Sequence, residues 1–205
     1  MGFYENVVLP YFIDLTCGMK ALEPERQKTA AALSGTVLEI GFGSALNLPH
    51  YPRSVTRVLG VDPSGRARHI GRRRIAALHC PVDIVGLTAE TIDVEDATAD
   101  SAIATFTICT IPGVERALGE VKRILKPGGR FHFLEHGRAP DRGVALWQDR
   151  LNGVQRAVAG GCNLNRDVPG LLEAAGFRVE FVEAGYFPRT PRTHGYLYRG
   201  SAVRD

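Results

Sequence analysis

The chain has 205 residues, of which 44% are hydrophobic and 23% charged, as in an ordinary globular protein rather than a disordered one. Its net charge of +3 comes from 25 basic and 22 acidic residues that are interleaved along the sequence, which argues against a nucleic-acid-binding surface. The four cysteines, at positions 17, 80, 109 and 162, have neither C-x-x-C pairing nor the spacing of zinc ligands, so we expect no metal site.

Residues 1–34 are predicted to form a helical flap or lid. The stretch up to Gly18 mixes aromatic and aliphatic side chains, and Pro24 suits the first turn of a helix that ends by Gly35. No signal-peptide pattern opens the chain, and the apolar segment 7–15 is far shorter than the ~20 residues that span a bilayer. We therefore expect a cytoplasmic protein without a transmembrane segment, and leave a peripheral membrane contact open.

From residue 35 to residue 205, strand and helix patterns alternate, which is typical of an α/β domain with a largely parallel sheet. Short apolar and β-branched runs predict strands at 36–40, 58–61, 82–85, 101–108, 130–135, 177–184 and 195–203. An arginine-rich helix is expected after residue 63, and apolar residues at helical spacing predict further helices at 113–126, 147–158 and 168–175. The chain has no internal repeat or interdomain linker, so we expect a single domain over 1–205.

A turn with two glycines, Glu39-Ile-Gly41-Phe-Gly43, follows the first predicted strand of this core. Glycine lets the main chain approach a ligand because no Cβ is in the way. Asp62 ends the next strand, and its distance from Gly43 is close to the ~20 residues expected for a carboxylate that accepts hydrogen bonds from a ribose diol. Leu46 stands where the dinucleotide pattern G-x-G-x-x-G needs its third glycine, which disfavours a nicotinamide-dependent oxidoreductase.

Several motifs resemble, in their order and spacing, those of class I S-adenosylmethionine-dependent methyltransferases. They are Glu39-Ile-Gly-Phe-Gly, Gly60-Val-Asp62, Ala89-Glu90, Leu125-Lys-Pro-Gly-Gly129 and Glu173-Ala-Ala-Gly-Phe177. The resemblance implies a Rossmann-like, doubly wound, mostly parallel seven-stranded sheet with an antiparallel C-terminal strand. It also implies S-adenosylmethionine as cofactor and S-adenosylhomocysteine as product. Phe42 departs from the small or polar residue that is common in the family, and is expected to narrow the space beside the methionine tail.

The resemblance assigns cofactor contacts to residues at the ends of the predicted strands. Around the amino-acid end and the ribose these are Glu39, Gly41, Phe42, Gly43, Asn47 and Asp62, and around the adenine they are Pro63, Ala89 and Glu90. Thr105 and Phe106 are expected to face the cofactor at the switch point of the sheet. For Glu90, a loop carboxylate in water is an equally good interpretation.

A closer likeness covers nearly the whole chain. The segments Tyr4 to Gly18, Phe133-Leu-Glu-His136 and Gly161 to Asp167 resemble a subgroup of small methyltransferases that includes alkyl-thiol S-methyltransferases of animals and their bacterial relatives. This likeness implies methyl transfer to a small acceptor, with a thiol as one candidate. Transfer to oxygen, nitrogen or carbon of a natural product, quinone or lipid head group remains an alternative, as does a cofactor-binding protein without turnover.

Candidate catalytic and substrate residues follow from position and chemistry. His136, after the fifth predicted strand, suits proton removal at neutral pH, with Glu135 to orient it. Candidate acceptor contacts are Tyr4, Tyr11, Trp147, Cys162 and Arg166. Each has a structural alternative: His136 tying down a loop, Cys162 buried in the core, Arg166 in a salt bridge, and the aromatic residues in the core rather than in a lid. We expect a monomer or homodimer without a nucleic-acid partner.

Overall fold

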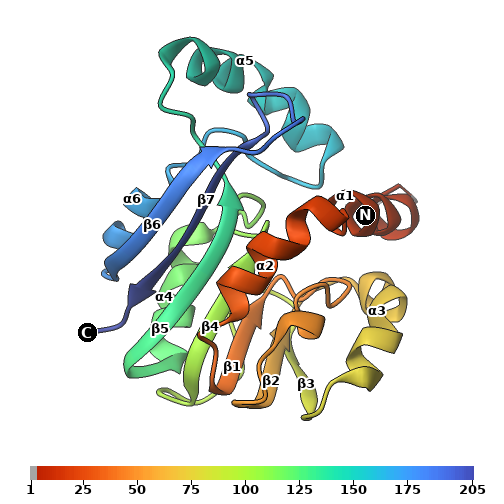
Figure 1. The fold of residues 1–205 in the computed structure, drawn as a ribbon, viewed down its shortest axis with the longest axis vertical. Helices are drawn as coiled ribbons and strands as arrows, with labels where there is room; N and C mark the ends of the chain where they lie inside the picture. Colours follow the sequence, from red (N-terminus) through yellow and green to blue (C-terminus); the bar gives the residue numbers. More distant parts are fainter. Residues whose placement is uncertain (1–3) are drawn as a thin grey trace.

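Seven strands form one sheet through the centre of the molecule, in the order β3-β2-β1-β4-β5-β7-β6 (Figure 1). The computed structural model describes residues 4–205. The strands are β1 (Gly35–Ile40), β2 (Val55–Val61), β3 (Val82–Gly86), β4 (Ala99–Thr105), β5 (Leu125–His136), β6 (Arg178–Tyr186) and β7 (Tyr196–Val203). Strand β7 pairs antiparallel with β5 and with β6, and the remaining pairs are parallel. The expected mostly parallel sheet with an antiparallel C-terminal strand is confirmed.

Helices lie on both faces of this sheet and across one of its ends. They are α1 (Leu9–Cys17), α2 (Glu23–Ala30), α3 (Gly65–Ala77), α4 (Val114–Ile124), α5 (Arg142–Val158) and α6 (Val168–Ala174), with shorter turns at η1 (Tyr4–Val8), η2 (Lys20–Leu22) and η3 (Leu48–His50). Figure 1 shows α2 in front of the sheet and α4 behind it, with α1 and α5 at the end where the parallel strands finish. No helix within residues 4–205 has the length and apolar character needed to cross a bilayer.

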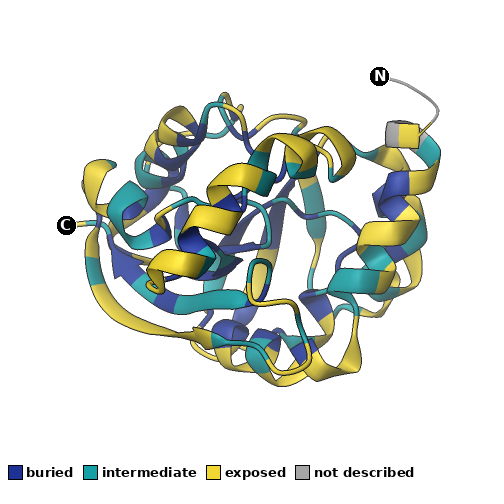
Figure 2. Ribbon diagram, turned by 90° about the horizontal axis from the view of Figure 1, so that it is seen from above, coloured by how far each residue is buried: buried dark blue, intermediate teal, exposed yellow. Residues whose placement is uncertain are grey.

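Two apolar clusters, one on each face of the sheet, make up the core. Alternate residues of β1 divide between them: Val37 belongs to one cluster, and Leu38 and Ile40 to the other. This division follows from the two-residue period of a strand, which sends successive side chains to opposite faces. Both faces are apolar because both are covered, as parallel sheets require, and Figure 2 shows the buried strands between helices whose outer sides are exposed.

The chain order of the sheet reverses between β1 and β4. In open α/β sheets the loops after the strands part at such a switch point and leave room for a ligand. Helix α1 is fixed over this point by Asp14, whose carboxylate accepts hydrogen bonds from Ser44 at 2.7 Å and from Arg74 at 2.9 Å. The N-terminal segment therefore lies against the loop that follows β1.

The elements lie within about five residues of their predicted positions: β5 begins at Leu125 rather than 130, and α5 begins at Arg142 rather than 147. The difference that bears on the site is at the end of the fourth strand. The sequence predicted a strand over 101–108, but β4 ends at Thr105 because Phe106 adopts a positive φ of 54°. A left-handed residue cannot continue a strand. The chain therefore turns at the switch point three residues earlier than its Ile- and Thr-rich composition indicates.

Candidate active site

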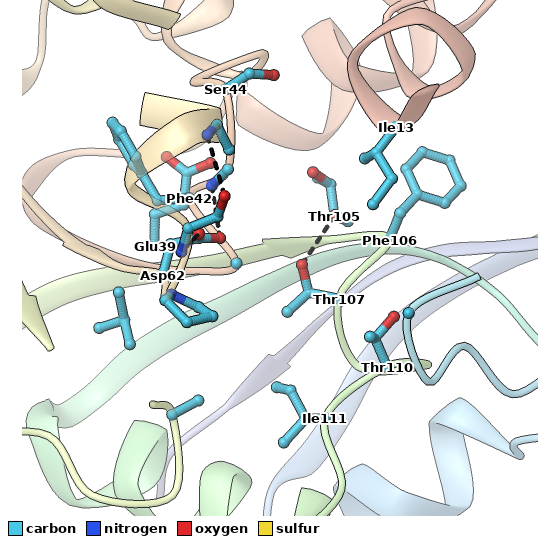
Figure 3. Close-up of a pocket in the computed structure, with 18 of the residues that line it drawn as sticks. Ile13, Glu39, Phe42, Ser44, Asp62, Thr105, Phe106, Thr107, Thr110 and Ile111 are labelled. Carbon is cyan, nitrogen blue, oxygen red and sulfur yellow. Dashed lines mark hydrogen bonds between the residues drawn. The ribbon is translucent and has the colours of Figure 1, made fainter. Parts of the chain in front are cut away.

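A cavity of about 660 Å³ opens at the switch point, and its walls come from elements far apart in the sequence. The glycine turn after β1, the ends of β2 and β4, and residues of α1 and α2 all line it. All eleven predicted cofactor-contact residues are among those that line the cavity. Figure 3 shows Glu39, Phe42 and Asp62 on one side of it and Ile13, Phe106 and Thr110 across from them.

The glycine turn has the close-approach geometry that its sequence indicates. Gly41 and Gly43 have φ values of 70° and 51°, in the region that favours glycine. A Cβ on Gly41 would lie 1.9 Å from Oγ1 of Thr107, so no other residue fits there without movement of the facing loop. The ring of Phe42 is only 2% exposed and belongs to a core cluster, so little of it faces the cavity and the expected narrowing is small.

Asp62 joins the glycine turn to the end of β2. Its Oδ2 accepts a hydrogen bond from the backbone N–H of Gly43 at 2.9 Å, and its Oδ1 accepts one from that of Ser64 at 2.7 Å. Burial raises the pKa of this carboxyl above its ordinary value, although the two backbone donors act in the opposite direction. Each oxygen retains a free lone pair, so Asp62 can still accept hydrogen bonds from a diol in the cavity.

Glu39 is a fully buried carboxyl at the inner end of the cavity. Asn47 donates to its Oε1 and Tyr51 to its Oε2, each at 2.7 Å. Burial raises the pKa of Glu39 to about 7, and the hydrogen bonds from these two side chains offset part of that shift. A cationic group of a ligand placed nearby would stabilise the charged form and lower this pKa again.

Arg26, on α2, brings a buried guanidinium into the same end of the cavity. The side chain is 4% exposed and donates to Asn47 Oδ1 at 2.6 Å, Thr105 Oγ1 at 2.8 Å and the carbonyl of Cys17 at 3.0 Å. Burial lowers its pKa, as expected of a charge removed from water. Among the described residues it forms no ion pair and its Nε has no hydrogen-bond partner, so a ligand carboxylate would compensate its charge.

The opposite end of the cavity is bordered by Pro63, Ala89 and Glu90. Glu90 accepts a hydrogen bond from the backbone N–H of Gly113 at 3.1 Å and another from the hydroxyl of Thr88. The bond from Thr88 is the main reason that the pKa of Glu90 is lowered. Glu90 therefore connects its own loop to the start of α4 as well as bordering the cavity.

The remaining wall is apolar and carries few groups that exchange protons. It is built by Leu9, Pro10 and Ile13 of α1, by Thr110, Ile111 and Pro112 after β4, and by Gly160 and Gly161 after α5. Of the cavity-lining residues within 4–205, the ionisable ones are Cys17, Arg26, Glu39, Asp62 and Glu90. None of these is a histidine, lysine or tyrosine that could act as a general base on this wall.

Comparison with known proteins agrees with this geometry. The family profile described as a methyltransferase domain matches residues 38–133, from β1 to β5. Human thiol S-methyltransferase TMT1A is 31% identical over 80% of this chain and 69% of its own length. The chain belongs to the class I S-adenosylmethionine-dependent methyltransferases.

Other methyltransferases of this family act on different acceptors. Phosphatidylethanolamine N-methyltransferase of Cereibacter sphaeroides is 33% identical to this methyltransferase over 68% of the chain and 68% of its own length. The crystal structure of a methyltransferase from Thermotoga maritima aligns with a TM-score of 0.69 over 98% of both chains, at 23% identity. The structural match shows the shared fold, and the relatives do not agree on an acceptor.

The predicted catalytic residues of this methyltransferase lie outside the cavity lining. Glu135 is fully buried and accepts hydrogen bonds from the backbone N–H groups of Thr107 at 2.6 Å, Ile108 at 3.0 Å and Cys109 at 3.3 Å. Its carboxylate thus holds the loop after β4, and burial raises its pKa.

His136 forms a 3.0 Å contact from Nε2 to Cys162 Sγ. Burial lowers the pKa of His136, but the contact with Cys162 and the charge of Glu135 outweigh it, and the net shift is upward.

The candidate acceptor residues also lie outside the lining. Cys162 is 8% exposed and lies 3.8 Å, sulfur to sulfur, from Cys109. Arg166 donates to the backbone carbonyls of Ile108 and Ile111, so it supports the loop after β4 rather than forming the ion pair that was its alternative.

The aromatic candidates lie at the surface. Tyr11 and Trp147 are 52% and 53% exposed, and the hydroxyl of Tyr4 donates to the carbonyl of Val158 at 2.7 Å. These aromatic residues are not core residues.

The sequence analysis missed one residue of the cavity and one cluster of side chains beside it. Arg26 lies in a polar helix without a motif, so nothing in its local sequence distinguishes it from a surface arginine. Cys109, His136 and Cys162 come together although they are far apart along the chain, and their donor atoms lie within 4.8 Å of one another. Spacing rules for zinc ligands detect local clusters only.

Proposed function

We propose that this protein transfers the methyl group of S-adenosylmethionine to a small apolar thiol. The main support is the wall formed by α1, the loop after β4 and the loop after α5, which is apolar and lacks a histidine, lysine or tyrosine among its described residues. A thiol with a pKa near ~8.5 is already a few per cent ionised at neutral pH, so it reacts with little assistance. A hydroxyl or carbon acceptor needs a positioned base, and an ammonium must first lose a proton.

The residues of the cavity fit the cofactor at both of its ends. Arg26 would hold the carboxylate of the methionine part and Glu39 its ammonium, since these are the buried cation and carboxyl at that end. Asp62 would accept the two ribose hydroxyls, and Ala89 with Pro63 would contact the adenine. Gly41 and Gly43 leave the backbone open on the ligand side.

The protein's contribution to the reaction is then placement and exclusion of water. When bound, S-adenosylmethionine supplies a methyl group on a sulfonium that is already electrophilic. Ile13, Ile111 and the backbone of Gly161 would form the apolar side on which a thiolate approaches in line, at about 3–3.5 Å. Helix α1 would act as the lid that keeps water out, because Asp14 fixes it to Ser44 and Arg74 beside the cofactor turn.

The proposal is tested with labelled S-adenosylmethionine and a panel of an alkanethiol, a phenol, a primary amine and phosphatidylethanolamine vesicles. We expect transfer to the thiol, with a rate that rises with pH toward the thiol pKa. The Ile13→Ser variant should raise the KM of a long-chain thiol more than that of a short one. Ile84→Ser, on the exposed face of β3, is the matched control because the two residues are 43% and 40% exposed. Tight cofactor binding without transfer to any acceptor would instead indicate a binding protein.

A lipid amine is the second candidate, and one surface feature favours it. Large exposed apolar side chains lie on η1, α1 and α5: Val8, Tyr11, Phe12, Ile13 and Leu15, with Leu146, Trp147, Val154 and Val158. Figure 1 shows α1 and α5 at the end of the sheet where the parallel strands finish. Such a patch suits contact with a lipid surface. Methylation of phosphatidylethanolamine in vesicles, with no transfer to the thiol, would replace the first proposal by this one.

A further inference from the structure

Three side chains that bind soft metals meet in a cluster beside the cavity. Cys109 lies in the loop after β4, His136 is the last residue of β5, and Cys162 lies in the loop after α5. His136 Nε2 is 3.0 Å from Cys162 Sγ, and the two sulfur atoms are 3.8 Å apart. None of the three lines the cofactor cavity, so the cluster is a separate feature of the fold.

The spacing of these donor atoms is close to that of a tetrahedral zinc site. With Zn–S bonds of about 2.3 Å, two thiolates on one zinc ion lie about 3.8 Å apart. The sulfur atoms of Cys109 and Cys162 already have this separation. An imidazole nitrogen on the same ion lies about 3.5 Å from each sulfur. The 3.0 Å separation between His136 Nε2 and Cys162 Sγ would therefore lengthen by about 0.5 Å, and the donor atoms of His136 and Cys109 already lie within 4.8 Å of one another.

The two cysteine loops are held in place by hydrogen bonds that do not involve the sulfur atoms. Asn163 donates to the carbonyl of Cys109 twice, from its backbone N–H at 2.9 Å and from Nδ2 at 2.8 Å. Glu135 accepts from the backbone N–H of Cys109 at 3.3 Å, and Arg166 donates to the carbonyls on either side of that residue, at Ile108 and Ile111. A metal ion would therefore bind to ligands that are already positioned.

Ligand type and burial both favour zinc over a hard cation. Two thiolates and an imidazole suit zinc, whereas calcium and magnesium require oxygen ligands. Cys109 and Cys162 are 2% and 8% exposed, which shields a metal–thiolate bond from water. Within residues 4–205 no further His, Cys, Asp or Glu joins this group, which leaves one coordination position for a small ligand.

We propose that Cys109, His136 and Cys162 bind one zinc ion. Binding displaces the thiol protons of both cysteines to solvent, as each sulfur forms its bond to the metal as a thiolate and the neutral imidazole contributes its lone pair. The ion links the loop after β4, the end of β5 and the loop after α5. This proposal does not depend on which molecule accepts the methyl group.

Metal titration of the wild-type chain tests the site without any variant. The protein is reduced, stripped with a chelator under anaerobic conditions, and titrated with zinc against a chromogenic chelator and, separately, with cobalt. We expect one zinc per chain, protection of two of the four thiols from a thiol reagent, and the thiolate-to-metal and d–d absorption bands of tetrahedral cobalt. Absence of zinc binding, with the thiol reactivity of the protein the same with and without the metal, would overturn the proposal.

Ligand variants locate the ion. We expect zinc affinity to fall in each of the variants Cys109→Ser, Cys162→Ser and His136→Ala. The loss should exceed ~10–100-fold, which is the effect of removing a residue that only hydrogen-bonds to a metal ligand. Cys80→Ser, which changes a thiol outside the cluster, should leave it unchanged. Circular dichroism checks that each variant folds. Wild-type zinc affinity in all three ligand variants would contradict the assignment. So would the loss of two free thiols in the absence of reductant although zinc is present, because Cys109 and Cys162 would then form a disulfide instead of binding the metal.

Discussion

The carboxylate of Asp62 accepts a hydrogen bond from the backbone N–H of Gly43 at 2.9 Å. This contact joins the end of β2 to the glycine turn after β1, so that the residue predicted to bind a ribose also fixes the turn that lies against the ligand. Since the same carboxylate accepts a second backbone hydrogen bond from Ser64, its position is determined before any ligand binds. A preorganised acceptor of this kind costs little ordering entropy on binding.

Replacing Asp62 by alanine should weaken the binding of S-adenosylhomocysteine. Loss of hydrogen bonds to a charged acceptor is worth about 1.5–3 kcal/mol, which corresponds to a roughly 10–150-fold rise in Kd. Isothermal titration calorimetry measures the change. Asp83→Ala is the control, because Asp83 lies on the exposed edge strand in an ion pair with Arg57 and outside the cavity. An unchanged Kd in the Asp62 variant would show that the ribose binds elsewhere.

Arg26→Gln should distinguish between ligands with and without a carboxylate. If the guanidinium binds the methionine carboxylate, affinity for S-adenosylhomocysteine should fall about 10–150-fold, the scale of a charge-assisted contact. Affinity for 5′-methylthioadenosine, which lacks the amino-acid part, should change by less than about twofold on the same reasoning. The second ligand also reports whether the variant is folded. Equal losses for both ligands would mean that Arg26 supports the cavity without contacting the carboxylate.

The raised pKa of Glu39 predicts a pH dependence of cofactor binding. At about 7 in the folded chain against an ordinary value of 4.5, this carboxyl is largely protonated at pH 6 and largely ionised at pH 8. A ligand ammonium prefers the ionised form, so affinity for S-adenosylhomocysteine should rise by up to ~10-fold between these pH values, with release of a proton. Glu39→Gln should remove this dependence and leave only the titration of the ligand's own amino group.

The raised pKa of Glu39 also makes the stability of the fold depend on pH, in the opposite direction to cofactor affinity. A carboxyl whose pKa is higher in the folded chain binds its proton more tightly there than in the unfolded chain. Its contribution to stability is therefore fully present below about pH 4.5 and is lost as the pH rises through about 7. Urea unfolding of the ligand-free wild type and of Glu39→Gln over this range measures the difference. If the free energy of unfolding of the wild type instead rose relative to that of Glu39→Gln as the pH increased, Glu39 would be ionised in the folded cavity.

The cofactor half of the site was predictable because its signals are local. Gly41, Gly43 and Asp62 are required by backbone geometry and by their place at strand ends, and such requirements leave a trace in a short stretch of sequence. The other half depends on long-range packing. His136 and Glu135 look like a catalytic pair next to each other in sequence, yet alternation along β5 sends them to different surroundings, one to Cys162 and the other to the backbone of residues 107–109.

Glu135→Gln tests that structural role. A glutamine keeps the shape of the side chain but has one oxygen for three backbone donors, and its NH₂ group would face N–H groups that need an acceptor. Because a buried donor that loses its charged partner costs about 1–3 kcal/mol, we expect the free energy of unfolding to fall by about 1–3 kcal/mol.

Hydrogen exchange locates the effect of this substitution. The amides of Thr107, Ile108 and Cys109 should exchange faster in Glu135→Gln, while those of β2 exchange as in the wild type, since the loop after β4 loses its acceptor and the far strand does not. Glu173→Gln, an exposed change on α6, should stay within ±0.5 kcal/mol of the wild type. If Glu135→Gln matched the wild type in both measurements, the loop would be held by Arg166 and Asn163 alone, and the carboxylate of Glu135 would be free for another role.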